Sequence, residues 1–548
     1  MSARSSQETV PGRVASAPVY PVLLTSYYVL RLYSENTSVF HASQLARPIL
    51  VLGGAVILCL LVLRYLPRLN IHKAAFGSFA LAFLLTLSSE LAGLLGSAAL
   101  QTAGMAVLTL GIVAAALIFR HNYRTTMLLN AVCLSLLVLP VLAIVKADIL
   151  APATAPDRFL ESVTTAGAGP SYVHIVLDGY SRADVLAETY GHDNQPFLDE
   201  LGGMGFAVFD EARSPYNQTA LNLAAVFSGT YLDFDDLAQH SRSRNELHRM
   251  LGRYVGDSSV LSVLRRAGYR TLATDTGYAF SDLATFDHVA SPAVGAGRLS
   301  LFETRLLARS GLGFLMIVGR AASAVAGSPD GRAEPEIGRE AERLNLVLRY
   351  AFESPVPGIQ DGNFFLYQHI LAPHPPFTID RDGRDWTKFT DRFGGIADGS
   401  HAVRHNEDNR VAYMAGYIEK LRYTNAALLA RLRRLIEQTP EPLIIVLHGD
   451  HGGGAYYDQE DLSLTCARER FSPLLAVYAS DPAWRDEIRN RLQASPNLVN
   501  IYRAIFATVY DADIPVLGNN SYYAPWNDTY QAIPVSPERL AESCGKTE

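Results

Sequence analysis

The sequence predicts an α-helical transmembrane bundle of about five spans, followed by an α/β domain with a mostly parallel central sheet flanked by helices. Uncharged apolar stretches are concentrated before residue 150, and after residue 170 strand-like apolar runs alternate with amphipathic helical patterns. Only 18% of the 548 residues are charged, whereas a soluble protein carries about a quarter. The chain is also too long for one domain of ordinary size.

Five apolar stretches are candidates for membrane spans. Four of them carry no charge and are about as long as a helix that crosses ~30 Å of hydrocarbon. The first contains prolines, tyrosines and Arg31, which makes it a weaker candidate. Because several spans follow one another, a cleavable signal peptide does not fit. The stretches are residues 18–33, 48–63, 74–89, 100–119 and 126–145.

The basic residues of the short loops predict the orientation of this bundle. Arg64, Arg68 and Lys73 lie between the second and third stretches, and Arg120 and Arg124 lie between the fourth and fifth. The loop between the third and fourth stretches has no Lys or Arg. Basic loops stay on the inner side of a membrane. The chain after about residue 150 is therefore expected outside, whether or not the first stretch spans the inner or plasma membrane.

The rest of the chain is expected to form a linker and one large domain. Residues 151–170 are rich in Ala, Pro, Thr and Gly and have no core of their own, and residues 171–548 form the extracytoplasmic domain. An amphipathic helix is expected at residues 417–439. In open parallel sheets, ligands gather beyond the carboxyl ends of the strands. The expected strands are residues 171–178, 269–276, 363–370, 442–450 and 472–480.

Charge and cysteine content exclude some classes of function. The net charge is −7 and no basic stripe with interleaved aromatics occurs, so nucleic acid is not an expected partner. The four cysteines do not resemble a Cys-rich zinc site. Cys59 and Cys133 lie in apolar stretches, where cysteine packs as a small hydrophobe. Cys466 and Cys544 can form a disulfide if they lie outside the cytoplasm and close together.

Two of the expected strands end in metal-ligating residue types. The first ends in "HIVLDGY" with Asp178, which can also serve simply as a cap for the next helix. Another ends in "VLHGDHGGG", where Asp450 and His451 are adjacent and glycines allow the backbone to turn. Carboxylate oxygen with imidazole nitrogen suits Zn²⁺ or Mn²⁺. The alternative is a polar turn that happens to contain histidines.

Two further residues stand at places where chemistry is expected. His374 lies between prolines in "ILAPHPPF", just past a strand, and can also be an ordinary loop histidine. Thr219 stands at the start of the helical pattern "TALNLAAVFSG", where threonine is a favoured N-cap. A helix N-terminus also attracts anions. A hydroxyl bound there to a divalent ion becomes a nucleophile near neutral pH.

In this order, the residues resemble the alkaline phosphatase/sulfatase superfamily. The resemblance covers about residues 170–530, and Ser228-Gly229 follows Thr219 at the spacing seen in sulfatases. It is closest to the membrane-anchored branch, which includes lipoteichoic acid synthases and lipid A phosphoethanolamine transferases and has about five N-terminal spans. The segments "ERFSPLLAVY" and "LVNIYRAIF" also look like the C-terminal part of such domains. An alkaline phosphatase-like fold is expected.

The resemblance implies a role for each of these residues. Asp178, Asp450 and His451 match metal ligands, Thr219 matches the nucleophile that also binds the metal, and His374 matches the histidine that contacts the transferred group. One divalent ion is expected, Zn²⁺ or Mn²⁺ first, with Mg²⁺ or Ca²⁺ left open. His448, which precedes the pair, is expected to support the site rather than to bind the ion.

One departure from the family pattern bears on the substrate. Thr219 stands where sulfatases have the Cys or Ser that becomes formylglycine. We therefore expect a metal-dependent phosphoryl or substituted-phosphoryl transferase or hydrolase, acting on envelope lipid or glycan among membrane lipids through a phospho-threonine intermediate. The alternatives are a sulfoester hydrolase, or a non-catalytic envelope protein that keeps the fold for binding or assembly. A transporter is disfavoured because the spans are few and nearly free of charge.

Overall fold

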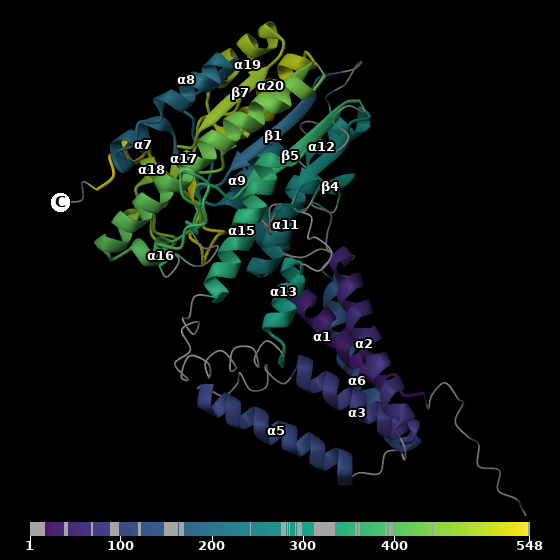
Figure 1. Cartoon of the computed structure of the whole chain (residues 1–548). Helices are drawn as coiled ribbons and strands as arrows, with labels where there is room; N and C mark the ends of the chain where they lie inside the picture. The colour runs from purple at the N-terminus through teal and green to yellow at the C-terminus, as the bar shows by residue number, and fades with distance from the viewer. Residues whose placement is uncertain are drawn as a thin grey trace, which may run out of the picture. The chain divides into compact units, whose positions relative to one another are not determined.

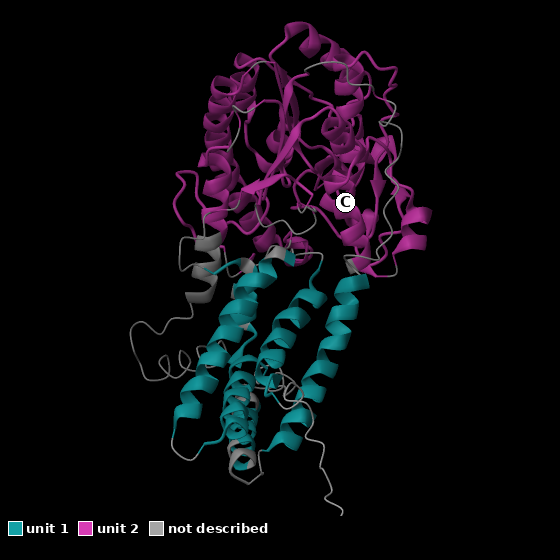
Figure 2. Cartoon of the chain, turned by 90° about the vertical axis from the view of Figure 1, so that its right-hand side faces the viewer, with its two compact units in different colours: residues 1–151, 294–332 teal, residues 152–293, 333–548 magenta. Residues whose placement is uncertain are grey.

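The computed structural model describes two compact units (Figures 1 and 2). One comprises residues 1–151 and 294–332, the other residues 152–293 and 333–548. The described residues are 17–37, 42–66, 69–87, 98–118, 122–146, 163, 169–241, 243–275, 281, 283, 285–290, 292, 299–311, 335–356, 359, 362–389, 392–393, 398–440 and 442–545.

Each of the five predicted spans contains a helix within the described residues, which leave out residues 88, 89 and 119 of the third and fourth stretches. Two of these helices, α2 and α6, are long and apolar enough to cross a membrane, and α1 and α3 have only 16 residues each. The weakest candidate by sequence, α1, packs against α2, α3 and α6. A set of apolar helices followed by an α/β domain is therefore confirmed, while the number of spans stays a prediction. The helices are α1 (Tyr20–Glu35), α2 (Ala46–Tyr65), α3 (Ile71–Thr86), α5 (Ala98–Ile118) and α6 (Tyr123–Ile144).

A later helix also belongs to the first unit. Helix α13 (Leu301–Ala308) buries Phe302 in the same apolar cluster as residues of α1. Glu303 of α13 forms an ion pair with Arg47 of α2. The predicted domain boundaries assign this segment to residues 171–548, whereas the structure groups residues 294–332 with the N-terminal helices.

The second unit is built on a seven-stranded sheet with the order β2-β7-β6-β1-β5-β3-β4. Strand β7 runs antiparallel to its two neighbours, and the remaining pairs are parallel. All five predicted strands are present, and the three-residue strands β2 and β4 add to them. The strands are β1 (Ser171–Leu177), β2 (Phe206–Val208), β3 (Arg270–Thr274), β4 (His288–Ala290), β5 (Phe364–Ile370), β6 (Leu443–Gly449) and β7 (Leu475–Ala479), with a separate hairpin of β8 (Tyr522–Tyr523) and β9 (Ile533–Pro534).

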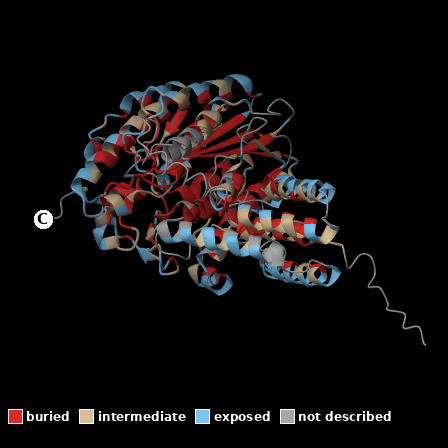
Figure 3. Ribbon diagram, turned by 60° about the horizontal axis from the view of Figure 1, so that its bottom comes forward, coloured by how far each residue is buried: buried red, intermediate tan, exposed pale blue. Residues whose placement is uncertain are grey.

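Helices cover both faces of this sheet, and its strands are buried (Figure 3). Helices α7 (Ala183–Tyr190), α8 (Gln195–Gly203), α15 (Pro335–Glu353) and α17 (Glu407–Gln438) contribute to the apolar core on one face. Helices α9 (Thr219–Ser228), α12 (Ser259–Arg266), α19 (Pro482–Ala494) and α20 (Ile501–Val509) contribute to the core on the other. The smaller or peripheral helices are α10 (Phe234–His240), α11 (Arg244–Gly256), α16 (Ser400–Val403), α18 (Ala467–Phe471) and α21 (Pro537–Ala541).

Helix α17 begins ten residues before the predicted start at residue 417. The side chain of Asn406 caps it by accepting a hydrogen bond from the Asn409 N–H at 3.0 Å. Asp, Asn and Ser side chains cap helices in this way. The added first turns also pack in the core, because Ala412 and Tyr413 are buried in it.

Strand alternation decides which side chains meet at the end of the sheet. Successive side chains of a strand point to opposite faces, so His174, Val176 and Asp178 share the face covered by α9. Val176 pairs in register with His369 of β5 on one side and with His448 of β6 on the other. His174, His369 and His448 of the three central strands therefore lie on the face of the sheet that α9 covers.

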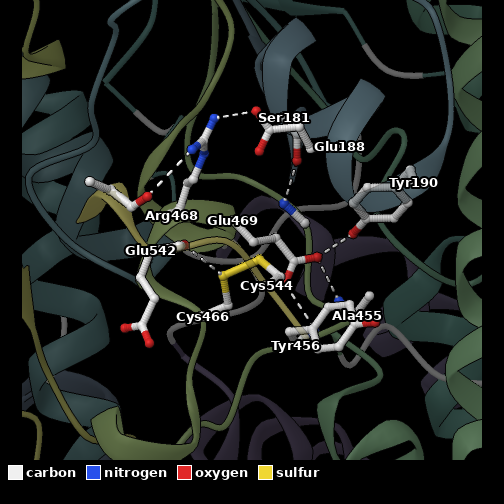
Figure 4. The surroundings of a disulfide bond; sticks show 12 residues. Ser181, Glu188, Tyr190, Ala455, Tyr456, Cys466, Arg468, Glu469, Glu542 and Cys544 are labelled. Atoms are coloured by element: carbon white, nitrogen blue, oxygen red, sulfur yellow. Dashed lines mark hydrogen bonds and ion pairs between the residues drawn. A yellow bond between two sulfur atoms is a disulfide. The ribbon is translucent and has the colours of Figure 1, made fainter. Parts of the chain in front are cut away.

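Cys466 and Cys544 form a disulfide with their Cα atoms 5.4 Å apart (Figure 4). The bond ties the segment before α18 to the C-terminal end of the described chain. Cys133 is buried and Cys59 is half-buried, and both lie in apolar helices. The pairing that the sequence allowed is therefore present, and it fits an extracytoplasmic domain.

Candidate active site

Asp178 lies directly after β1 and is 2% exposed. Its backbone N–H donates to the Ile370 carbonyl at 2.9 Å, and its carbonyl accepts from the His374 N–H at 3.0 Å. The next residue, Gly179, has a φ of +71°, which disfavours any side chain there. These bonds hold the end of β1 against the loop that follows β5.

Asp450 follows β6, and its two carboxylate oxygens have different surroundings. Oδ1 accepts from the N–H groups of Gly179 and His451, each at 2.9 Å. Oδ2 is buried and accepts no hydrogen bond from the described residues. One carboxylate oxygen therefore fixes the turn, and the other is available to a ligand.

His451 presents one nitrogen to the same site. Its Nδ1 lies 2.8 Å from the Gly452 carbonyl, to which only a protonated nitrogen can donate. Its Nε2 therefore carries the lone pair, 3.3 Å from Asp450 Oδ2 and 3.9 Å from Asp178 Oδ1. This is the tautomer that a metal ligand requires.

The glycines of "GDHGGG" allow other backbone to approach this turn. A Cβ on Gly452 would lie 1.8 Å from the Glu469 carbonyl, and one on Gly449 would lie 2.4 Å from the Tyr180 carbonyl. Neither position tolerates a side chain unless the backbone moves. The glycines thus serve close approach as well as the turn that the sequence predicts.

Thr219 is the first residue of α9 and not its N-cap. The N-cap is Gln218, whose side chain makes no capping bond. The Thr219 Oγ1 instead lies 3.1 Å from His451 Nε2. The capping explanation for this threonine is therefore wrong, and its hydroxyl contacts the same His451 nitrogen that lies 3.3 Å from Asp450 Oδ2.

The structure adds a residue that the sequence interpretation missed. His369, in β5, is buried and places Nε2 3.4 Å from Asp178 Oδ2. Ligand atoms of Asp178, His369 and Asp450 all lie within 4.8 Å of one another. The signal in the sequence is "NFFLYQHI", where His369 stands next to the end of a mainly apolar strand, five residues before His374.

These side chains fit a divalent cation. Asp178 Oδ1 and Asp450 Oδ2 are both buried and have no hydrogen-bond partner among the described residues. Burial of an unpaired carboxylate is costly unless a cation or hydrogen bonds compensate it. Two carboxylates with imidazole nitrogen form a donor set typical of Zn²⁺ or Mn²⁺. The buried group can therefore hold a divalent metal ion.

The electrostatics of the site favour the metal-binding protonation states. Burial by itself raises the pKa of Asp178, but the neighbouring His374, His369 and His451 lower it overall. Burial and the nearby Arg470 lower the pKa of His451 below its usual value. At neutral pH the carboxylate is thus ionised and the imidazole is neutral, as metal ligands must be.

His374 approaches Asp178 from the loop after β5. Its Nδ1 lies 2.6 Å from the Pro375 carbonyl, and its Nε2 lies 3.9 Å from Asp178 Oδ1. The buried Lys420 of α17 donates from Nζ to the carbonyls of Leu371 at 2.8 Å and His374 at 2.6 Å. Burial lowers the pKa of Lys420 to about 7. The lysine holds the His374 loop in place and was not predicted.

His448 belongs to a different group of side chains. Its Nδ1 lies 2.8 Å from the Gly449 carbonyl, and its Nε2 lies 2.9 Å from His174 Nε2. His174 Nδ1 in turn lies 2.7 Å from the Tyr502 hydroxyl. Both nitrogens of His448 are engaged, which agrees with the supporting role expected for it.

Two residues of α18 support the turn and also escaped prediction. Glu469 accepts from the backbone N–H groups of Ala455 at 3.0 Å and Tyr456 at 2.8 Å, and from the hydroxyl of Tyr190 (Figure 4). Arg470 places Nη2 3.1 Å from His451 Nε2. Both lie in "RERFSP", a segment whose sequence indicates only its likeness to the C-terminal part of the family's domains.

The fold and site define an α/β protein with a carboxylate-rich metal-binding group beyond the carboxyl ends of its central strands. The Sulfatase family model matches residues 170–471, more than half of the chain. The chain belongs to the Sulfatase family and is an enzyme of the alkaline phosphatase superfamily. None of the curated proteins matches it.

Several solved structures are similar to the chain. Lipooligosaccharide phosphoethanolamine transferase A, an integral membrane protein of Neisseria meningitidis, is 13% identical, with a TM-score of 0.36 over 92% of this chain and 97% of that chain. The C-terminal periplasmic domain of EcEptC from Escherichia coli, in complex with Zn, is 12% identical, with a TM-score of 0.39 over 70% and 98%. The lipoteichoic acid synthase LtaP from Listeria monocytogenes is 12% identical, with a TM-score of 0.35 over 67% and 82%.

Proposed function

We propose that the protein transfers or hydrolyses a phosphoryl or substituted-phosphoryl group through a covalent phospho-threonine at Thr219. The observation that carries the proposal is the position of the Thr219 hydroxyl, 3.1 Å from His451 Nε2 at the start of a helix. Beside it lie two buried carboxylates, each with an oxygen that has no hydrogen-bond partner in the described part of the chain. This is the arrangement of a metal-activated nucleophile.

The metal would be held by Asp178, Thr219, Asp450 and His451, with His369 as a further nitrogen donor on the other side of Asp178. A bound divalent ion lowers the pKa of a coordinated hydroxyl and neutralises charge on transferring oxygens. The mixed oxygen and nitrogen donors favour Zn²⁺ or Mn²⁺ over Mg²⁺ or Ca²⁺. A divalent ion held there would compensate the two buried oxygens that have no hydrogen-bond partner among the described residues.

The chain's own groups account for the two steps of transfer. Thr219 Oγ1 forms a bond to phosphorus while the bond from phosphorus to the leaving oxygen breaks, and the hydroxyl proton passes to solvent. Protonated His374 gives a proton to the leaving alkoxide through Nε2. In the second step an acceptor alcohol or water loses its proton to His374 and forms a bond to phosphorus. The bond from phosphorus to Thr219 Oγ1 breaks, and the threonine oxygen regains a proton from solvent.

The apolar helices of the first unit point to a lipid environment for the reaction. We propose that the five predicted spans lie in the inner or plasma membrane and that the sheet domain lies outside the cytoplasm. The Cys466–Cys544 disulfide supports that location. A substrate on an envelope lipid or glycan follows from it, with membrane lipids as neighbours.

Sulfoester hydrolysis is the alternative within the same fold. Sulfatases use formylglycine made from Cys or Ser, and the corresponding residue here is Thr219. A threonine cannot be converted to that aldehyde, so phosphorus is the favoured centre. A binding or assembly protein that keeps the fold without catalysis would show no turnover.

The decisive experiment assays the full-length protein in detergent with phosphomonoester, phosphodiester and sulfate-ester substrates. Turnover of a phosphoester should need Zn²⁺ or Mn²⁺, stop with EDTA and disappear in Thr219→Ala. Thr230→Ala is the matched control, because Thr230 follows the end of the same helix and its hydroxyl donates to the Tyr231 carbonyl. Mass spectrometry of quenched wild type should find phosphate on Thr219.

Each other outcome of this assay is also informative. Full activity in Thr219→Ala would remove the nucleophile assignment. Preference for the sulfate ester would favour the sulfatase alternative. No metal and no turnover on any ester would favour the binding protein.

A further inference from the structure

Arg470, which supports the turn after β6, is also a buried cation at the edge of the metal-binding group. It lies on α18 and is 4% exposed. Its Nε donates to the Asn217 carbonyl at 2.8 Å, and its Nη1 lies 3.5 Å from the Gly453 carbonyl. Its Nη2 donates to His451 Nε2 at 3.1 Å. The guanidinium therefore joins the segment before Thr219 to the turn after β6.

The charge of Arg470 is not neutralised by direct contact. Within the described part of the chain it forms no ion pair, and its guanidinium carbon lies 3.9 Å from the centre of the Tyr457 ring. Burial opposes its charge, but Tyr457, Asp398 and Asp450 raise its pKa overall, so it stays protonated. Buried arginines are normally paired with an anion.

The guanidinium also has N–H groups beyond those that make its three contacts. Its three contacts use fewer N–H groups than an arginine side chain carries. The contact of Nη2 with His451 Nε2 uses the lone pair that a metal ion would take, so ligation of His451 would make Nη2 available as well. Both nitrogens of the fork then have N–H groups available for oxygen atoms of a ligand.

The position of Arg470 relative to Thr219 selects the ligand. Thr219 Oγ1 and Arg470 Nη2 each lie 3.1 Å from the same nitrogen, His451 Nε2. We propose that Arg470 is a catalytic residue that binds a non-bridging oxygen of the phosphoryl group as that group is transferred to and from Thr219. The assignment rests on the proposed function for its catalytic part, whereas its anion-binding part can be tested without turnover.

The chain provides a matched control two residues away. Arg468 lies on the same short helix and is paired with two carboxylates. Asp184 lies at 3.1 Å, and Glu188 lies at 2.8 Å (Figure 4). Its charge is therefore already used in structure. Arg468→Ala removes an arginine from α18 without touching Thr219 or the metal-binding residues.

The test measures anion binding first. Inorganic phosphate is titrated calorimetrically into full-length protein loaded with Zn²⁺, with zinc content measured on the same samples. Arg470→Ala should weaken phosphate binding on the order of 10²-fold with unchanged zinc content. Arg470→Lys should lose less, because it keeps the charge but not the fork. Arg468→Ala should bind phosphate as wild type does.

The same variants are then compared in turnover. Arg470→Ala should lower kcat on the order of 10²-fold, and added guanidinium ion should restore part of it, which a purely structural defect would not show. Unchanged phosphate affinity in Arg470→Ala with full zinc content would overturn the proposal. Loss of zinc would also overturn it, in favour of a role in holding His451.

Failure of the proposed function has a different signature. Phosphate binding that depends on Arg470 in a wild-type protein without phosphoester turnover would leave the anion site standing and remove the transferase. Turnover at wild-type rate in Arg470→Ala would leave the transferase standing and remove Arg470 from it. If Arg470→Ala does not fold, Arg470→Lys and the Arg468→Ala control still decide the anion-binding claim.

Discussion

Two groups of polar side chains lie on the same face of the three central strands, and they differ in how their hydrogen bonds are completed. In the first, His174, His448 and Tyr502 form a chain with contacts of 2.9 and 2.7 Å, and His448 closes it on the Gly449 carbonyl. In the second, at the ends of the strands, Asp178 and Asp450 each keep a buried oxygen without a partner among the described residues. His448 of the first group and Asp450 of the second are separated by a single residue, Gly449.

This difference separates structural from functional polar residues. A buried polar group with all partners in place stabilises the fold and specifies its packing. A buried carboxylate oxygen without a partner destabilises the metal-free protein, and its presence is explained by a ligand. Histidine content alone would have joined the two groups into one site.

The largest predicted effect is on the second group. Asp450→Asn keeps the acceptor at Oδ1 but removes the charge from the metal-binding group, so turnover should fall by about 10³-fold or more. The metal-free variant should be more stable than metal-free wild type by about 1–3 kcal/mol, because an uncompensated buried charge is gone. Steady-state kinetics and urea unfolding with EDTA measure the two effects.

Asp486→Asn is the control for that variant, because Asp486 is exposed and lies on α19 rather than at the end of β1 or β6. It should change neither quantity. A less stable metal-free Asp450→Asn would mean that the carboxylate is satisfied in the fold, and the distinction between the two groups would lose its basis.

The first group should respond in the opposite way. His448→Ala removes a buried imidazole together with its two contacts, leaves His174 without one of its own contacts, and opens a cavity. The expected cost is about 2–4 kcal/mol in unfolding free energy. Zinc content and turnover per folded molecule should stay near wild type. Exposed His401→Ala should cost less than about 0.5 kcal/mol. Loss of zinc in His448→Ala at intact fold would make His448 a ligand after all.

Much of the site could be predicted from the sequence, because its residues stand at the ends of recognisable strands and at the start of a recognisable helix. Asp178 and Asp450 each end an apolar strand, and strand ends of a parallel sheet meet at one edge. The helix start at Thr219 could be placed by its pattern, although the N-cap itself proved to be Gln218. The family resemblance then ordered these residues into one site.

The remainder depends on distances that no pattern encodes. His369 contributes because β5 pairs with β1 and brings it to Asp178, and that strand order was not predicted. Lys420 and Arg470 lie on helices, where arginine and lysine are usually a solvated face. The sequence pattern also did not place α13 with the N-terminal helices, although its Phe302 is buried in their apolar cluster.

His369 offers a direct way to measure how far the second group extends. His369→Ala should lower zinc affinity by about 10–100-fold, the effect of losing a supporting or direct nitrogen ligand. Competition with a chromophoric chelator measures it. His288→Ala, an exposed histidine on β4, serves as the control. Unchanged affinity would confine the ion to Asp178, Thr219, Asp450 and His451.

The smallest effect concerns acid stability of the first group. Burial lowers the pKa of His448 to about 4, below about 6.5 in an unfolded chain. The unfolded state therefore binds the proton more readily, and the stability from the neutral imidazole is complete above about pH 6.5 and is lost progressively toward pH 4. At pH 5 this loss should be about 1–2 kcal/mol.

The double variant His174→Phe, His448→Leu should flatten urea-unfolding stability across this window, whereas exposed His401→Ala should leave the slope unchanged. An unaltered slope in the double variant would show that other groups set the acid limit, and that the closed histidine chain contributes packing without a proton-linked term.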